Sequence, residues 1–174
     1  MSTYSSDQVR KRFTESNDFN EIFDAFENAL LQRIDDIELY RLLFWNKSLS
    51  PEELCLFGEK LAKEFPRISF DVYFWLASVF ETTFAQKDNY ELAFTYYRKA
   101  TKVNPNEVAP YLKLCECFDP IVNLPPIDEL ILFLEEGVEI VSEPKQLLEW
   151  LIRLYEIKGE DEKVEMYKRR LSEK

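Results

Sequence analysis

The side chains best able to do chemistry in this sequence are carboxylates that occur in adjacent groups. Paired acids can act as general acid and base, or bind a metal ion, when they converge in space. Most of these groups fall where a helix is expected to begin, and there a carboxylate stabilises the positive end of the helix dipole. We interpret them as helix-start residues, with metal binding or acid–base catalysis as the alternative. The groups are Asp35-Asp36, Glu52-Glu53, Asp128-Glu129, Glu135-Glu136 and Glu160-Asp161-Glu162.

The sequence lacks the residues that other common catalytic sites require. The chain has no histidine, so a serine or cysteine nucleophile would need an unusual base such as lysine. Glycine occurs only at positions 58, 137 and 159, which leaves no glycine-rich phosphate loop. The sequence therefore predicts a protein that is not an enzyme, with no catalytic residues and no cofactor.

The three cysteines are expected to be buried thiols. Cys115 and Cys117 are two residues apart on a predicted helix, so their side chains diverge by about 160° and do not bridge easily. Without histidine or a second cysteine pair they make a poor metal site, and we expect no metal. Unpaired thiols favour a reducing compartment, and the expected location is cytoplasmic.

The charge balance limits the partners. There are 22 Lys and Arg against 33 Asp and Glu, a net charge of −11, which opposes binding to nucleic acid or an anionic membrane surface. The excess acid lies in residues 19–65 and 119–158; it forms either a solvated exterior or a surface that selects basic partners. No window approaches the roughly 18 apolar residues of a membrane span, and residues 1–7 do not read as a targeting segment.

These residues must be positioned by helices. Only three glycines occur among 174 residues, alongside 14 Phe, 9 Tyr and 3 Trp, and turn dipeptides typical of β-hairpins are nearly absent. This composition favours an all-α fold of long helices joined by short turns.

One stretch sets the register of these helices. Ala93 and Ala100 lie two turns apart on one helix face, where methyl groups allow close approach of a neighbouring helix and Tyr97 fills the space between them. Pro105 ends that helix, and the next one carries Tyr111, Leu114 and Phe118 at an aromatic-x2-Leu-x3-aromatic spacing.

This pattern resembles the tetratricopeptide repeat (TPR) family. Pro66, Pro105 and Pro144 recur at intervals of 39 residues, longer than the roughly 34 of an ordinary TPR, so the repeat is TPR-like. The resemblance is strong over residues 70–118 and 145–171 and weak over 34–66 and 119–143. It implies a right-handed α–α superhelix, a solenoid of stacked helical hairpins.

We divide the chain accordingly. Residues 1–33 are expected to form an amino-terminal helical cap, with the first residues frayed. The TPR-like repeats then occupy residues 34–66, 67–105, 106–143 and 144–172. Within them, Ser50-Pro51-Glu52-Glu53 predicts a capping box at a helix start, and the helix over residues 71–86 is expected to be one turn longer than the family norm.

In TPR-like proteins the first helices of successive hairpins line a concave groove that receives a segment of a partner. The resemblance places eleven residues on that surface: Phe74, Trp75, Ser78, Glu81, Leu112, Lys113, Glu116, Glu149, Trp150, Arg153 and Glu156. Trp75 and Trp150 fall at equivalent positions. Each either anchors a partner or packs between adjacent repeats.

The predicted function is therefore a non-catalytic protein–protein interaction module: an adaptor, scaffold or chaperone-like protein. The two-Lys, two-Asn, one-Arg clamp that binds chaperone carboxyl termini in some TPR proteins is missing, and acids outnumber bases in the predicted groove. We expect a peptide or helix with apolar anchors and some positive charge. The alternatives are a structural protein that self-assembles, with weak homo-oligomers, and an all-α enzyme or metal-binding protein that uses its acids.

Overall fold

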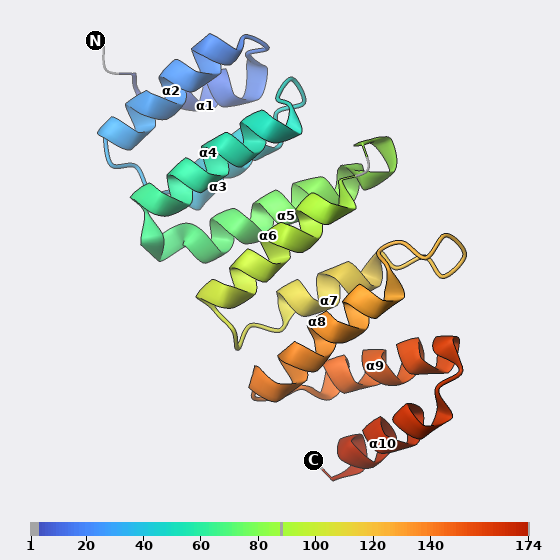
Figure 1. The fold of residues 1–174 in the computed structure, drawn as a ribbon. Helices are drawn as coiled ribbons and strands as arrows, with labels where there is room; N and C mark the ends of the chain where they lie inside the picture. The colour runs from blue at the N-terminus through green and yellow to red at the C-terminus, as the bar shows by residue number, and fades with distance from the viewer. Residues whose placement is uncertain (1–3, 88, 174) are drawn as a thin grey trace.

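The computed structural model describes residues 4–87 and 89–173, and the regular elements within them are all helices (Figure 1). The predicted all-α, TPR-like solenoid is confirmed. The described elements are α1 (Ser6–Glu15), α2 (Phe19–Leu31), α3 (Ile37–Phe44), α4 (Pro51–Glu64), the 3-10 helix η1 (Pro66–Ile68), α5 (Ser69–Lys87), α6 (Tyr90–Val103), α7 (Ala109–Glu116), α8 (Ile127–Ile140), α9 (Lys145–Lys158) and α10 (Asp161–Ser172).

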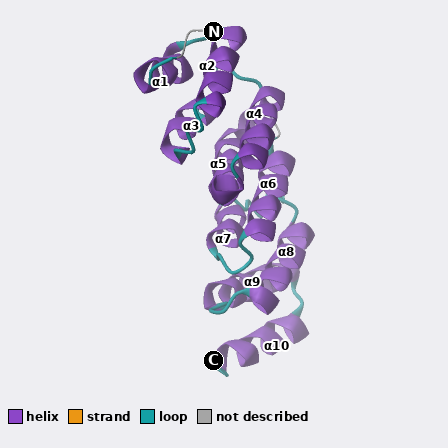
Figure 2. Ribbon diagram, turned by 90° about the vertical axis from the view of Figure 1, so that its left-hand side faces the viewer, coloured by secondary structure: helices purple, strands orange, loops and turns teal. Residues whose placement is uncertain are grey.

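The helices form two layers. Figure 2 shows the odd-numbered helices along one side of the stack and the even-numbered helices along the other. Most even-numbered helices also contact the odd-numbered helix that follows: α4 packs on α5, α6 on α7 and α8 on α9. The molecule is therefore a row of hairpins in which each hairpin is supported by its neighbours.

Helix starts follow the predicted capping residues. Ser50 Oγ accepts from the Glu53 backbone N–H at 3.2 Å, and Glu53 Oε2 accepts from the Ser50 N–H at 2.7 Å, which completes the capping box of α4. Asp36 caps α3 by accepting from the Glu38 N–H at 3.0 Å. A second capping box, formed by Ser5 and Gln8, begins α1.

Helix α5 is the longest described helix. It runs without a break for 19 residues, against 14 in each of α4, α6, α8 and α9. The predicted extra turn therefore continues the helix rather than forming a loop. Its start differs slightly from the expectation, because η1 precedes it and α5 begins at Ser69.

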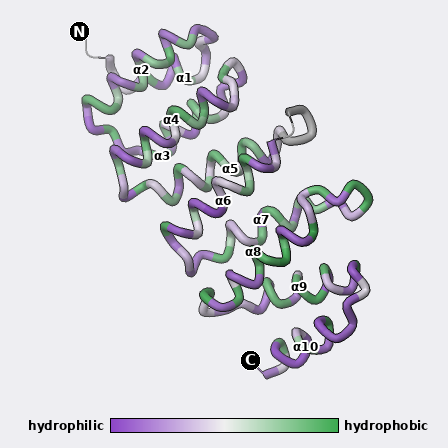
Figure 3. Tube along the Cα trace, in the orientation of Figure 1, coloured by the Kyte–Doolittle hydropathy of each residue, from purple (hydrophilic) through white to green (hydrophobic). Residues whose placement is uncertain are grey.

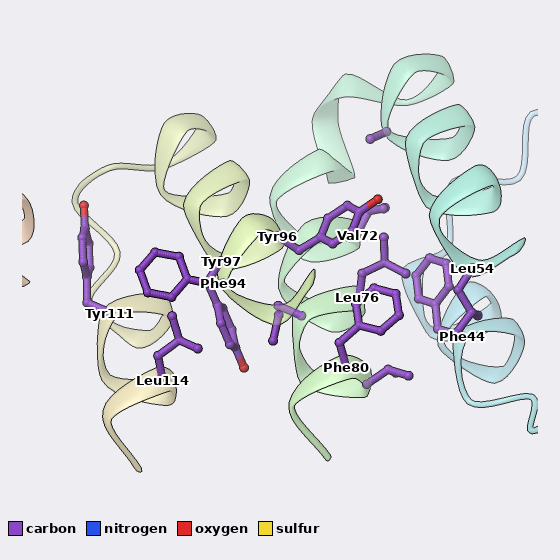
Figure 4. Packing of buried hydrophobic residues seen from close by; sticks show 14 of the residues in the cluster. Phe44, Leu54, Val72, Leu76, Phe80, Phe94, Tyr96, Tyr97, Tyr111 and Leu114 are labelled. Atoms are coloured by element: carbon purple, nitrogen blue, oxygen red, sulfur yellow. The ribbon is translucent and has the colours of Figure 1, made fainter. Parts of the chain in front are cut away.

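A continuous apolar core lies between the two layers. Ala93, Tyr97 and Ala100 are fully buried, as their spacing predicted. Figure 4 shows the core passing from Phe44 and Leu54 through the α5–α6 hairpin to Leu114. No helix in the described part of the chain is long and apolar enough to cross a membrane.

Gly58 lies where α4 and α5 approach closely. A Cβ atom on Gly58 would lie 2.1 Å from Leu76 Cδ1. Leu76 of the next hairpin therefore occupies the space beside Gly58.

Ion pairs join each even-numbered helix to the next. Lys60 of α4 pairs with Glu27 of α2, and Lys99 of α6 pairs with Glu59 of α4. The two later steps, from α6 to α8 and from α8 to α10, are made by Arg98–Glu136 at 3.7 Å and Arg170–Glu139 at 2.7 Å. These contacts repeat along the layer of even-numbered helices and link one hairpin to the next.

The amino-terminal helices form a further hairpin. Helix α1 packs on α2 and also contacts α3. The buried Asn46, after α3, donates through Nδ2 to the carbonyl oxygens of Phe13 at 2.8 Å and Ser16 at 3.0 Å. This polar contact fixes the end of α1 against the stack. We propose that residues 1–33 form an amino-terminal cap.

Candidate interaction surface

The eleven groove residues predicted from the sequence lie on α5, α7 and α9, which belong to the odd-numbered layer (Figure 2). We call the surface that these three helices present the odd-helix face. Its residues fall into separate local clusters, described below from α5 to α9.

Three of the four predicted residues of α5 are engaged by Tyr97 of α6. The Phe74 ring meets the Tyr97 ring edge-on at 5.7 Å, and Ser78 Oγ lies 3.3 Å from the Tyr97 hydroxyl oxygen. The same hydroxyl donates to Glu81. Phe74, Ser78 and Glu81 are all half-buried. They therefore join the two helices of the hairpin as well as forming part of its surface.

Glu81 also connects this cluster to the end of α7. Its Oε1 accepts a hydrogen bond from Cys117 Sγ at 3.1 Å. Burial, together with the hydrogen bond to Glu81, raises the pKa of Cys117 to about 12 and raises the pKa of Tyr97 as well. Both groups therefore stay protonated near neutral pH, which makes the thiol a weak nucleophile.

Trp75 is covered by an arginine from the preceding hairpin. The Arg41 guanidinium lies 3.8 Å from the Trp75 ring centroid, and Arg41 Nη1 donates to Glu38 Oε2 at 2.6 Å. Burial, followed by the charge of Glu38, raises the pKa of Asp71. Trp75 thus both packs against α3 and stands among acidic groups at the surface.

Trp150 lies in a pocket between α7 and α9. The pocket has a volume of about 340 Å³. The Arg153 guanidinium lies 5.0 Å from the Trp150 ring centroid, in a cation–π contact like that of Trp75. The lining residues are Leu112, Glu116, Gln146, Glu149, Trp150 and Arg153.

The charges around this pocket are mixed. Lys113 pairs with Glu116 at 2.7 Å, and that hydrogen bond, with the charge of Glu81 as a smaller contribution, raises the pKa of Lys113. Glu149 is exposed and makes no ion pair with any residue in the described part of the chain. One carboxylate at the rim is thus available to a cation.

The structure brings five of the predicted residues together and separates the others. Leu112, Glu116, Glu149, Trp150 and Arg153 share the α7–α9 pocket. The residues of α5 form their own clusters, and Lys113 stands beside Glu116 without lining the pocket. Glu156 points elsewhere, because it pairs with Lys168 of α10 at 3.4 Å.

Sequence analysis missed Arg41 and Gln146. Gln146 precedes Trp150 by four residues on α9, and this spacing places both on one helix face, so the helical period could have revealed it. Arg41 lies on α3 and has no local relationship to Trp75. Only the packing of successive hairpins brings it over the ring.

The acidic groups lie mostly at helix starts, as interpreted from the sequence. Asp36, Glu52, Asp128 and Asp161 stand at or within the first turn of α3, α4, α8 and α10. Glu135 and its neighbour are the exception, in the middle of α8. Among the described residues, no group of three acidic, cysteine or histidine side chains is arranged to hold a metal ion.

The fold and this face together define a class: an all-α, TPR-like solenoid of helical hairpins. Comparison with known proteins adds little to that class. No protein-family model matches the chain, and no curated protein matches its sequence. Among solved structures, the crystal structure of MamA protein is similar, with 17% identity and a TM-score of 0.48 over 96% of this chain and 92% of that chain. We draw no functional conclusion from a likeness at this level.

Proposed function

We propose that this chain is a non-catalytic protein-interaction module that binds a segment of another protein on its odd-helix face. The observation that carries the proposal is the α7–α9 pocket, where the half-buried Trp150 lines a cavity of about 340 Å³. A large, rigid aromatic side chain in a concave site is the residue type that most often anchors a protein partner.

The charges indicate the kind of segment. Glu149 makes no ion pair with a described residue, and near Trp75 the charge of Glu38 adds to burial in raising the pKa of Asp71. A Lys or Arg side chain of the partner could pair with Glu149 or lie near Asp71. We therefore propose a peptide or helix with an apolar anchor for the pocket and basic residues at its flanks.

The test is capture of partner from native lysate by the full chain and by the Trp75→Ala/Trp150→Ala variant. We expect the variant to keep its helical circular dichroism and to lose a specific band. A matched control is Leu56→Ala/Leu132→Ala, because both leucines are exposed and lie on the even-numbered helices α4 and α8. Equal capture by the tryptophan variant and the wild-type chain would reject the odd-helix face as the binding site.

A second comparison tests the proposed charge. Glu149→Gln removes the available carboxylate at the pocket, whereas Glu143→Gln removes an exposed carboxylate outside it. We expect only the first change to weaken capture, and the loss should diminish at high salt, where screening already weakens the ion pair. An equal effect of both changes would mean that net charge, not this site, governs binding.

A further inference from the structure

The loop that joins α7 to α8 presents two aliphatic side chains to solvent. Ile121 is 92% exposed and Val122 is 65% exposed, the former being the most exposed large hydrophobic residue in the described chain. We call this pair the knob. Figure 1 shows the loop projecting from the edge of the stack at which the two helices of each hairpin are connected.

Hydrogen bonds hold the knob in place. Asp119 and Leu124 exchange backbone hydrogen bonds at 2.9 and 3.3 Å across the base of the loop. Asp119 Oδ1 also accepts from the Ile121 and Val122 N–H groups at 2.8 and 3.4 Å. A loop already ordered in this way loses little conformational entropy when it docks.

The same edge carries a pocket. It has a volume of about 430 Å³ and lies between the α3–α4 connection and the end of α5; we call it the loop-edge pocket. Its walls combine apolar and polar side chains, and the 45% exposed Trp45 stands at its side. The lining residues are Phe44, Trp45, Asn46, Lys47, Leu49, Pro51, Leu54, Val79, Phe80, Thr82, Thr83 and Asn89.

We propose that the occupant of the loop-edge pocket is the knob of a second copy of this chain. The α3–α4 connection, which borders the pocket, and the α7–α8 loop lie on one edge of the stack (Figure 1), so a two-fold axis perpendicular to that edge and midway between them places each knob at the pocket of the other copy. This geometry closes on itself and gives a dimer.

Charge favours the same occupant. Lys47 lines the pocket, is exposed and makes no ion pair with a described residue. The knob carries Asp119 at its base, and the docked knob would bring this carboxylate towards Lys47. The contact is small, so the dimer belongs to the weak, transient class and forms only at high protein concentration. The knob–pocket contact involves neither tryptophan of the odd-helix face and is independent of the proposed function.

Sedimentation equilibrium of the full chain over a wide concentration range tests the proposal. We expect a monomer–dimer equilibrium. Two variants should each weaken it by at least about tenfold, a loss equivalent to roughly 1.4 kcal/mol. Ile121→Ser/Val122→Ser removes the apolar knob, and Thr82→Phe fills the pocket. Thr82 is suitable because it is exposed and its hydroxyl bonds only to backbone carbonyls of its own helix.

Mixing the two variants separates this contact from any other. The knob variant keeps its pocket and the pocket variant keeps its knob, so the mixture should form a heterodimer through one remaining contact, and it should associate more strongly than either variant alone. Ile157→Ser, at an exposed aliphatic residue of α9, is the control and should dimerise like the wild-type chain. The proposal is overturned by a wild-type chain that stays monomeric, or by a Thr82→Phe variant that dimerises normally.

Discussion

At the scale of single residues, Glu135 is a carboxylate with a specific structural role. It accepts hydrogen bonds from the hydroxyls of Tyr155 at 2.9 Å and Tyr167 at 2.6 Å, whose rings stack at 5.7 Å. One acid of α8 thereby fixes α9 and α10 in position. The Glu135-Glu136 pair was a candidate for catalysis or metal binding in the sequence. In the structure, Glu135 joins neighbouring helices through hydrogen bonds.

This arrangement predicts a loss of stability in alkali. Burial, then Glu135, raises the pKa of Tyr155 to about 12, and the pKa of Tyr167 is raised for the same reasons. Since the unfolded chain has an ordinary tyrosine pKa near 10, the folded state binds more protons between these values. The stabilisation is fully present below about pH 10 and is lost as the pH rises towards 12. Urea unfolding at a series of pH values measures it.

Replacing the carboxylate tests its part in that shift. Glu135→Gln keeps a hydrogen-bond acceptor but removes the charge, so the two tyrosines should titrate at lower pH in the ultraviolet absorbance of tyrosinate. Glu129→Gln is the matched control, because that carboxylate is exposed in the first turn of the same helix. Identical titrations of the Glu135→Gln variant and the wild-type chain would assign the shift to burial alone.

The two tryptophans show what a sequence can say about a candidate site. The sequence places them at equivalent positions, and in the structure each has an arginine near its ring. Arg153 follows Trp150 by three residues on one helix, a relationship visible in the sequence. The arginine over Trp75 comes from another hairpin. Which residue stands there depends on the register in which the two hairpins pack.

At the scale of elements, close helix contacts depend on glycine. Gly137 of α8 faces the odd-numbered helices on both sides: a Cβ atom there would lie 2.7 Å from Tyr111 Cδ1 and 3.0 Å from Leu147 Cδ1. Tyr111 is buried, and an aromatic ring cannot bend away as an aliphatic chain end can. Helix α8 can therefore pack this closely against α7 only because Gly137 has no side chain.

Gly137→Ala should accordingly destabilise the protein, although alanine is the better helix former by roughly 1 kcal/mol. Overpacking a well-filled core costs about 1–3 kcal/mol, and we expect that term to prevail. Thermal and urea unfolding give the difference. In a Tyr111→Leu background the same change should cost less, since the ring is gone; strictly additive effects would contradict the steric explanation.

Helix boundaries were predictable where a side chain caps the backbone. Ser50 and Asp36 cap the first turns of α4 and α3 through local hydrogen bonds. These bonds do not depend on the rest of the fold. The Ser5–Gln8 capping box was overlooked, and with it a well-formed α1. The close approach at Gly58 could not be foreseen, because it depends on the position of Leu76 in the next hairpin.

At the scale of the whole molecule, stability should be distributed along the stack. The core runs from end to end, but every hairpin touches mainly its neighbours, and the ion pairs of the even-numbered helices likewise join adjacent steps only. Figure 3 shows α10, the last helix, as largely hydrophilic, which suits the solvent-facing end of a solenoid. Perturbing one end should therefore leave the other end intact.

Leu151→Ala tests this expectation. Leu151 is fully buried in α9, and losing such a side chain costs about 2–5 kcal/mol. In a molecule whose hairpins are coupled only to their neighbours, amide hydrogen exchange should speed up in α9, α10 and the adjoining α8, while the amides of α1 to α4 keep their protection. Ile140→Ala, at an exposed residue of α8, should leave the pattern unchanged. If exchange instead accelerates equally from α1 to α10, the chain unfolds as one cooperative unit, and the proposed binding surface near Trp150 cannot open independently of the amino-terminal hairpins.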